Sequence, residues 1–161
     1  MPDHFDALIL GAGPAGGGVA SRLAEAGQKV AMTDAGLYGG TCPLTGCNPK
    51  KVLMGPAKIT QMAAHMQSKG IDRPPRVIWK DLMAFKRTFT EPVPEGAKNA
   101  YAGKGIETLS GAGRFTGPDT VEVEGREMTA DNIFICTGVK ARPLSFPGAE
   151  HTVDNVGFLD Q

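Results

Sequence analysis

The fold of this chain is decided by the stretch Phe5-Asp6-Ala7-Leu8-Ile9-Leu10-Gly11-Ala12-Gly13-Pro14-Ala15-Gly16. Residues 5–10 are mostly apolar and stop at a glycine, which predicts a buried parallel strand. The three glycines have the G-x-G-x-x-G spacing. The first permits a sharp turn, the second lets a pyrophosphate approach the backbone, and the third lets helix and strand pack closely. A helix over residues 14–25 would direct its unpaired N–H groups towards the phosphates.

A second strand, over residues 29–33, ends at Asp34, about 23 residues after Gly11. An acidic side chain at that distance can accept hydrogen bonds from ribose hydroxyls. We therefore predict a dinucleotide site at the glycine turn. This stretch leaves both FAD and NAD open as ligands, and a flexible loop beside a solvated aspartate is the structural alternative. A P-loop is excluded because no Gly-Lys-Ser/Thr follows the glycines.

Two cysteines, Cys42 and Cys47, lie five residues apart just before a helical segment. Five residues of regular helix rise about 7.5 Å, more than the usual disulfide Cα separation of about 4.4–6.8 Å. A bond between them therefore needs a distorted turn, which Pro43 and Gly46 permit. Thiols near helix N-termini and lysines ionise readily and are nucleophilic near neutral pH. The alternatives are inert buried thiols or a metal site, although the sequence has neither C-x-x-C nor a nearby histidine.

The cysteines belong to the stretch Gly39-Gly40-Thr41-Cys42-Pro43-Leu44-Thr45-Gly46-Cys47-Asn48-Pro49-Lys50-Lys51. It resembles the G-G-T-C-x-N-x-G-C-x-P-[SK]-K signature of the FAD-dependent pyridine nucleotide–disulfide oxidoreductases. This family includes dihydrolipoamide dehydrogenase, glutathione reductase and mercuric reductase. The similarity continues through residues 111–115 and 133–138. It ends in Pro147-Gly148-Ala149-Glu150-His151, which looks like the segment leading into the family's NAD(P) domain.

The resemblance implies a doubly wound, Rossmann-like α/β FAD-binding fold with a three-stranded β-meander insertion. Cys42 would be the interchange thiol that reacts with the substrate sulfur, and Cys47 the charge-transfer thiolate against the flavin. Asp34 would contact the adenosine ribose and Thr41 the diphosphate. Either Lys50 or Lys51 would lie near flavin N5. Further cofactor contacts are expected from Gly11, Gly13, Pro14, Ala15, Gly16, Gly40, Ala112, Gly113, Thr137 and Gly138.

Three residues depart from the family pattern. Leu44 stands where Asn is usual, so a hydrogen bond that helps fix the cysteine loop is expected to be missing. Asp34 replaces the commoner Glu and reaches one methylene less far towards the ribose. Cys136 replaces an Ala, and we expect it to be a small, buried apolar residue.

The resemblance implies that two electrons pass between NAD(P)H, FAD and the Cys42–Cys47 disulfide, to or from a disulfide or dithiol substrate. Residues 1–150 would form the FAD-binding domain and 151–161 the start of the connection to an NAD(P)-binding domain. No second G-x-G-x-x-G is present. We therefore expect the chain to be the first third of a longer, homodimeric enzyme. The rival hypotheses are a non-catalytic FAD-binding module and an NAD dehydrogenase domain, which would leave the cysteines unused.

The composition argues against nucleic-acid and membrane partners. The 161 residues include 17 Lys plus Arg and 17 Asp plus Glu, and no basic cluster stands out. No apolar run approaches the roughly 18 residues of a membrane span. The acidic N-terminus lacks the features of a signal peptide, so we expect a cytoplasmic protein. The three histidines, His4, His65 and His151, form no metal-binding pattern.

The remaining pattern predicts further elements. We expect a helix over residues 52–69, interrupted near Gly55 and Pro56, and a second helix over residues 77–90 that ends before Pro92. The expected strands are a third parallel one at 105–109, three short antiparallel ones at 113–116, 120–123 and 126–129, and a fourth parallel one at 132–136.

Overall fold

The computed structural model describes residues 2–160. They form two compact units. The sheet unit consists of the residues up to Cys42 together with Val93–Ala141, and the helical unit consists of Pro43–Pro92 together with the residues from Arg142 onward. Each unit contains segments that are distant in the sequence.

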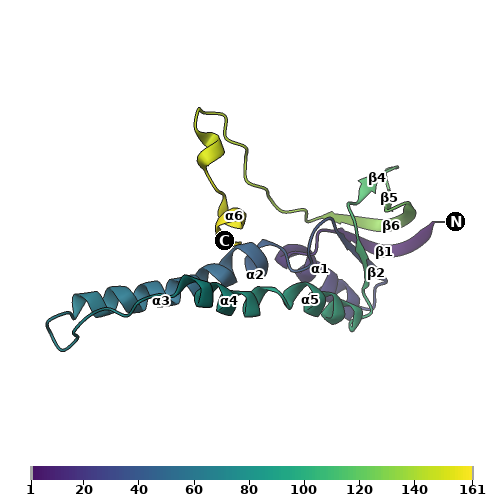
Figure 1. Ribbon diagram of the computed structural model, residues 1–161. Helices are drawn as coiled ribbons and strands as arrows, with labels where there is room; N and C mark the ends of the chain where they lie inside the picture. The colour runs from purple at the N-terminus through teal and green to yellow at the C-terminus, as the bar shows by residue number, and fades with distance from the viewer. Residues whose placement is uncertain (1, 161) are drawn as a thin grey trace. The chain divides into compact units, whose positions relative to one another are not determined.

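The sheet unit, within residues 2–160, holds one six-stranded sheet in the order β3-β2-β1-β6-β5-β4 (Figure 1). Strand β1 pairs in parallel with both β2 and β6, and β2 pairs in parallel with β3, whereas β5 is antiparallel to β4 and β6. This arrangement confirms the predicted Rossmann-like α/β fold. Its elements are β1 (Asp3–Leu10), α1 (Pro14–Glu25), β2 (Val30–Asp34), α5 (Val93–Ala102), β3 (Glu107–Ser110), β4 (Arg114–Phe115), β5 (Thr120–Val123) and β6 (Arg126–Ile135).

Strand β1 is buried on both faces, which explains its nearly continuous apolar sequence. Ala7 and Ile9 belong to a core that includes Ala20 of α1, with Tyr101 of α5 packed against it. Leu8 and Leu10, which alternate with them, belong to a second core. This core also includes Phe5 of β1 and side chains of β5 and β6: Val121, Val123, Met128 and Ala130. Helices therefore cover one face of the parallel strands, and the antiparallel strands contribute to the core on the other.

The prediction of separate strands at 126–129 and 132–136 is wrong, because β6 is one continuous strand of 10 residues. Its first part pairs with β5 on one side and with β1 on the other, and the pairing with β1 continues to Ile135. A break at Ala130 and Asp131 would interrupt that ladder. The third parallel strand begins at Glu107, later than expected, since the Ile106 N–H still bonds to the Tyr101 carbonyl at the end of α5.

The helical unit contains α3 (Cys47–His65), α4 (Trp79–Thr90), a short 3₁₀ turn (Ala149–His151) and α6 (Asn155–Leu159). Helix α2 (Thr41–Thr45) crosses the boundary between the two units. The expected interruption near Gly55 and Pro56 is wrong, because α3 continues through Pro56. An interior proline costs a helix about 3 kcal/mol. Packing of α3 along α4, which includes burial of Ala63 and Met83, offsets that cost (Figure 1).

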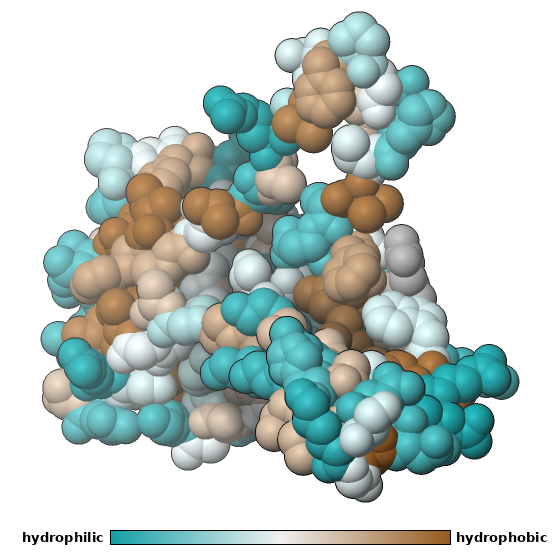
Figure 2. All heavy atoms as spheres, turned by 90° about the vertical axis from the view of Figure 1, so that its left-hand side faces the viewer, coloured by the Kyte–Doolittle hydropathy of each residue, from teal (hydrophilic) through white to brown (hydrophobic). Residues whose placement is uncertain are grey.

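Large apolar side chains are also exposed on the helical unit, among them Ile59, Met62 and Phe85. The space-filling view shows such brown side chains interspersed with teal polar ones (Figure 2). Within residues 2–160, none of the helices combines the length and the apolar character needed to cross a bilayer.

Because β1 is buried on both faces, truncation of Leu8 in this strand tests the described core. Leu8 is 0% exposed, whereas Leu37, in the same unit, is 65% exposed. We expect Leu8→Ala to lower the free energy of unfolding by about 3 kcal/mol, because a buried leucine leaves a cavity when it is truncated. Leu37→Ala should change it by about 0.5 kcal/mol or less. Urea denaturation of both variants measures the difference, and equal losses would contradict the described core.

Candidate functional site

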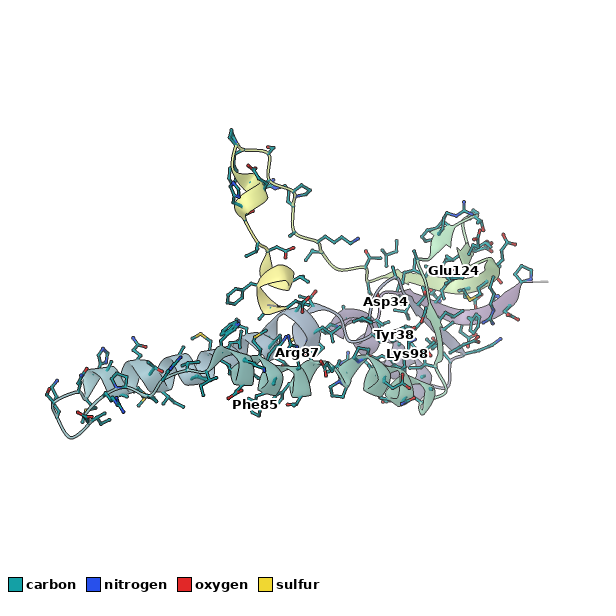
Figure 3. All side chains as sticks on the ribbon, in the orientation of Figure 1. Asp34, Tyr38, Phe85, Arg87, Lys98 and Glu124 are labelled. Atoms are coloured by element: carbon teal, nitrogen blue, oxygen red, sulfur yellow. The ribbon has the colours of Figure 1, made fainter. Side chains whose placement is uncertain are left out.

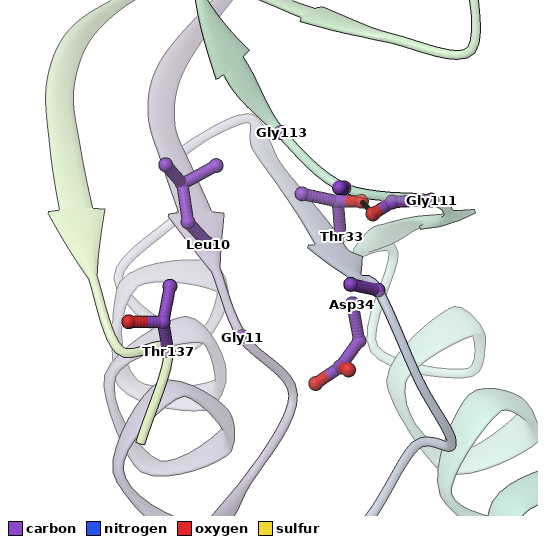
Figure 4. Close-up of a pocket in the computed structure, with 9 residues that line it drawn as sticks. Leu10, Gly11, Thr33, Asp34, Gly111, Gly113 and Thr137 are labelled. Carbon is purple, nitrogen blue, oxygen red and sulfur yellow. Dashed lines mark hydrogen bonds between the residues drawn. The ribbon is translucent and has the colours of Figure 1, made fainter. Parts of the chain in front are cut away.

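The carboxyl ends of the parallel strands surround a cavity of about 130 Å³ in the sheet unit. Gly11 follows β1, Asp34 ends β2 and Thr137 follows β6 (Figure 4). In the sheet, β1 has β2 as its neighbour on one side and β6 on the other. The chain leaves β1 towards β2 and returns later to β6, so the strand order reverses at β1. Folds of this kind bind ligands at such a switch point, beside the carboxyl ends of the strands. The complete lining is Leu10, Gly11, Thr33, Asp34, Ala35, Gly111, Ala112, Gly113 and Thr137.

The glycine turn has no room for side chains. Gly11 has a φ of +113°, and a Cβ on it would lie 2.2 Å from the Cys136 carbonyl oxygen. A Cβ on Gly16 would lie 1.9 Å from the Gly11 carbonyl oxygen. Both distances are far below a van der Waals contact. A glycine is therefore needed at Gly11 for the turn and at Gly16 for the close packing of helix and strand.

The first turn of α1 presents bare backbone. Gly13 is its N-cap and supplies no side-chain cap, Pro14 is the first helical residue, and no acidic residue lies in the first turn. The first intrahelical bond runs from the Gly17 N–H to the Gly13 carbonyl at 2.8 Å. The N–H groups of Ala15 and Gly16 therefore precede the helical ladder, which is the arrangement that binds anions.

Asp34 is fixed by backbone donors. Its Oδ2 accepts a hydrogen bond from the Ala12 N–H at 2.7 Å, and its Oδ1 accepts one from the Gly36 N–H at 2.8 Å. A carboxylate has about four lone-pair sites, so each oxygen can accept a further donor. The side chain thus connects the end of β2 to the glycine turn and keeps acceptor capacity for hydroxyl groups.

Tyr38 and Thr33 support this edge from behind, and sequence reasoning missed both. The Tyr38 hydroxyl is hydrogen-bonded to the carbonyls of Met32 at 3.0 Å and Leu109 at 2.7 Å, which belong to neighbouring strands. Burial, and then the nearby Asp34 carboxylate, raise the pKa of Tyr38 well above its usual value. Asp34, Tyr38 and Lys98 lie close together in Figure 3. Lys98 Nζ lies 5.1 Å from the Tyr38 ring centroid.

Thr33 joins β2 to the segment after β3. Its hydroxyl donates to the Gly111 carbonyl at 2.6 Å (Figure 4). This bond holds the backbone at Gly111, directly before the predicted Ala112 and Gly113, at the cavity. A polar residue at the end of an otherwise apolar strand was the signal that could have identified Thr33.

The cysteine loop lies at the junction of α2 and α3. Cys42 is the second residue of α2, Cys47 is the first residue of α3, and both are partly buried. Gly46 separates the two helices with a φ of −140° and a ψ of −107°, a non-helical conformation that provides the distorted turn expected there. Within residues 2–160, no three His, Cys, Asp or Glu side chains gather into a metal-binding group.

Cys47 and Lys50 line a second cavity, of about 580 Å³, within the helical unit. Both lie on the first turn of α3, three residues apart, so they share one face of the helix. Lys51 is not part of this lining. The other contributors are mostly apolar, and the complete set is Thr45, Gly46, Cys47, Lys50, Leu53, Met54, Trp79, Asn155, Phe158 and Leu159.

The structure thus brings together seven of the predicted site residues in two separate groups. Gly11, Asp34, Ala112, Gly113 and Thr137 line the sheet-unit cavity, whereas Cys47 and Lys50 line the helical-unit cavity. The others lie outside both linings: Gly13, Pro14, Ala15, Gly16, Gly40, Thr41, Cys42, Lys51 and Gly138. Cys136 packs against the core that includes Ala20 of α1, but it is only partly buried, so the expectation of a buried residue is not met in full.

Comparison with known proteins finds one family and several similar enzymes. The model of the pyridine nucleotide-disulphide oxidoreductase family matches residues 5–161. Dihydrolipoyl dehydrogenase of Mycoplasma pneumoniae is 33% identical over 97% of this chain and 34% of its own length. The enzyme of that name from Thermus scotoductus is 32% identical over 96% of the chain and 34% of its length. Mercuric reductase of Bacillus cereus is 31% identical over 96% of the chain and 24% of its length.

Two glycines of α1 provide a matched test of the turn. Gly16→Ala forces a Cβ against the Gly11 carbonyl, whereas a Cβ on Gly18 meets nothing within 4 Å. We expect Gly16→Ala to lower the free energy of unfolding by about 2–3 kcal/mol. Gly18→Ala should raise it by about 0.5–1 kcal/mol, because alanine loses less backbone entropy in a helix. Urea titration measures both, and a tolerated Gly16→Ala would contradict the close approach.

Proposed function

Because this chain belongs to the pyridine nucleotide-disulphide oxidoreductase family, we propose that it forms the FAD-binding part and the redox-active disulfide of a flavoprotein disulfide oxidoreductase. The chain spans about a third of the length of the dihydrolipoyl dehydrogenases that it matches, 34% in each case given above. The observation that carries the proposal is the cavity shared by Cys47 and Lys50, at the position of the family's cysteine signature.

The sheet unit suits the adenosine and diphosphate portion of FAD. A Cβ on Gly40 would lie 2.6 Å from the Gly13 Cα, so two backbone segments meet here with no side chain between them. The uncapped N-terminus of α1 favours a negatively charged group. Asp34 retains acceptor sites for ribose hydroxyls, and Ala112, Gly113 and Thr137 enclose the same cavity. We assign further contacts with the bound cofactor to Gly11, Pro14, Ala15, Gly16, Thr41 and Gly138.

The helical unit suits the flavin ring. Its cavity is lined by apolar and aromatic side chains, including Trp79 and Phe158, with few polar groups. Flat, largely apolar cofactors bind in cavities of this composition. Of the two lysines that the sequence left as alternatives, Lys50 is favoured for the position near flavin N5, since it lines the cavity together with Cys47.

Bound FAD would supply the hydride and electron chemistry. The cysteines carry the exchange with substrate. In the reduced form, the Cys42 thiolate attacks one sulfur of a substrate disulfide, and the other sulfur leaves as a thiol after taking up a proton. The Cys47 thiolate then attacks the Cys42 sulfur, which forms the Cys42–Cys47 disulfide and releases the second substrate sulfur, and this sulfur also takes up a proton to become a thiol. Two electrons thereby move from the cysteine pair to the substrate. The Lys50 ammonium stabilises a thiolate at Cys47.

The proposal extends to the whole protein. NAD(P)H would be the co-substrate, bound outside this chain, and a homodimeric cytoplasmic enzyme is proposed from the family resemblance. The substrate would be a disulfide, a dithiol or a related acceptor, because the names of the similar proteins include both a dihydrolipoyl dehydrogenase and a mercuric reductase.

Replacing the interchange thiol tests the mechanism. We expect Cys42→Ser in the full-length protein to retain bound FAD and to reduce the NAD(P)H-dependent disulfide reductase activity by at least about 1,000-fold, because no nucleophile then reaches the substrate. The remaining Cys47 thiolate should still give a long-wavelength absorption band beside the flavin. Unchanged activity in Cys42→Ser would exclude Cys42 as the interchange thiol. Wild-type protein that binds FAD but has no reductase activity would favour a pure FAD-binding module, and wild-type protein purified without flavin would overturn the proposal.

The neighbouring lysines provide a matched pair. In the Cys42→Ser background, the long-wavelength band titrates with the Cys47 thiolate. We expect Lys50→Met to move the pH midpoint of this band upward by about 0.5 unit or more, because a nearby cation favours the charged form of a thiol. Lys51→Met should leave the midpoint unchanged. A shift in Lys51→Met alone would reverse the assignment of the two lysines.

A further inference from the structure

The backbone between the two cysteines is held by a residue far along the chain. Asn155 Nδ2 donates a hydrogen bond to the Thr45 carbonyl at 2.8 Å, over a separation of 110 residues. Thr45 is the last residue of α2. Its carbonyl is therefore one of those at a helix end that receive no hydrogen bond from a backbone N–H of the same helix. The contact therefore satisfies the backbone at the point where α2 must stop and the chain must turn towards Cys47.

Asn155 is itself held in place by the contacts of α6. The preceding residue, Asp154, caps the helix by accepting a hydrogen bond from the Gly157 N–H at 2.9 Å. Leu159 is 5% exposed, and its carbonyl accepts a hydrogen bond at 2.6 Å from Lys86 Nζ, whose side chain is only 3% exposed overall. The Phe158 ring lies 6.2 Å from the Trp79 ring, centroid to centroid. Helix α6 is thus fixed against α4 by one buried cation and one aromatic pair.

The loop from Cys42 to Cys47 contains no Asn or Gln, so it has no side-chain amide of its own. Leu44 occupies the position at which the family signature has Asn, and its side chain offers no hydrogen-bonding group. Asn155 provides a side-chain amide to the next residue, Thr45, from a different element. The loop between the cysteines is therefore braced by a side chain of α6.

We propose that Asn155 is a positioning residue that holds the turn between Cys42 and Cys47 and thereby favours their disulfide. The inference rests on the proposed function, in which these thiols form a reversible couple. A braced turn keeps the two sulfurs near each other in the dithiol form, so less conformational freedom is lost when the bond closes. Without the brace the disulfide is easier to reduce.

The test is the equilibrium between this couple and glutathione in the full-length protein. The Cys42–Cys47 disulfide and two glutathione thiols exchange to give the dithiol and one glutathione disulfide, so atoms and electrons balance. Alkylation of the thiols followed by peptide mass spectrometry measures the oxidised fraction at each glutathione ratio. We expect Asn155→Ala and Asn155→Asp, which both remove the amide donor, to lower the equilibrium constant for disulfide formation about threefold to tenfold.

Asn99→Ala is the matched control, because the Asn99 amide is exposed and donates to Glu95 on its own helix at 3.3 Å. It should leave the equilibrium constant unchanged. A merely structural role for Asn155 would lower the midpoint of thermal unfolding and leave the constant unchanged, which would overturn the positioning role. An equal shift in Asn99→Ala would overturn it too. If the wild-type cysteines form no reversible couple with glutathione, the proposed function itself fails.

Discussion

The close approach of backbone to backbone at the glycine turn constrains the rest of the sheet unit. The Gly11 Cα lies so near the Cys136 carbonyl that a methyl group would fall 2.2 Å from that oxygen, and a methyl group on Gly16 would fall 1.9 Å from the Gly11 carbonyl oxygen. This contact places the end of β1 beside the end of β6 and the start of α1 against β1. The carboxyl ends of the parallel strands consequently share one edge, at which Gly11 and Gly16 leave no room for a side chain.

Burial on both faces of β1 keeps this turn in place. The helices supply one core and the antiparallel strands the other, so the parallel strands are covered on both sides. Tyr38 strengthens the arrangement because its hydroxyl is hydrogen-bonded to carbonyls of adjacent strands. A rigid edge of this kind can hold a ligand through backbone N–H groups, since they need no reorganisation when the ligand binds.

The predictable part of the structure is the part that depends on local spacing. The glycine turn, strand β1, the position of Asp34 and the break before α5 follow from residues that are near each other in the sequence. The continuous course of β6 and the passage of α3 through Pro56 depend on pairing and packing with distant segments, which local rules cannot include. The same reason applies to the site. Thr33 at Gly111 and Asn155 at Thr45 are contacts over 78 and 110 residues.

The contrast between the two cavities gives the two units different chemical properties. In the sheet unit the cavity is formed largely by glycines, short side chains and one carboxylate, so recognition there depends on backbone and on Asp34. In the helical unit the cavity is formed by large apolar side chains with a thiol and an ammonium on one helical turn. Lys50 is exposed and Cys47 is partly buried, so the ammonium of Lys50 is in contact with solvent beside a largely apolar lining. The second cavity therefore has a thiol in its lining, whereas the lining of the first has one carboxylate and no cysteine.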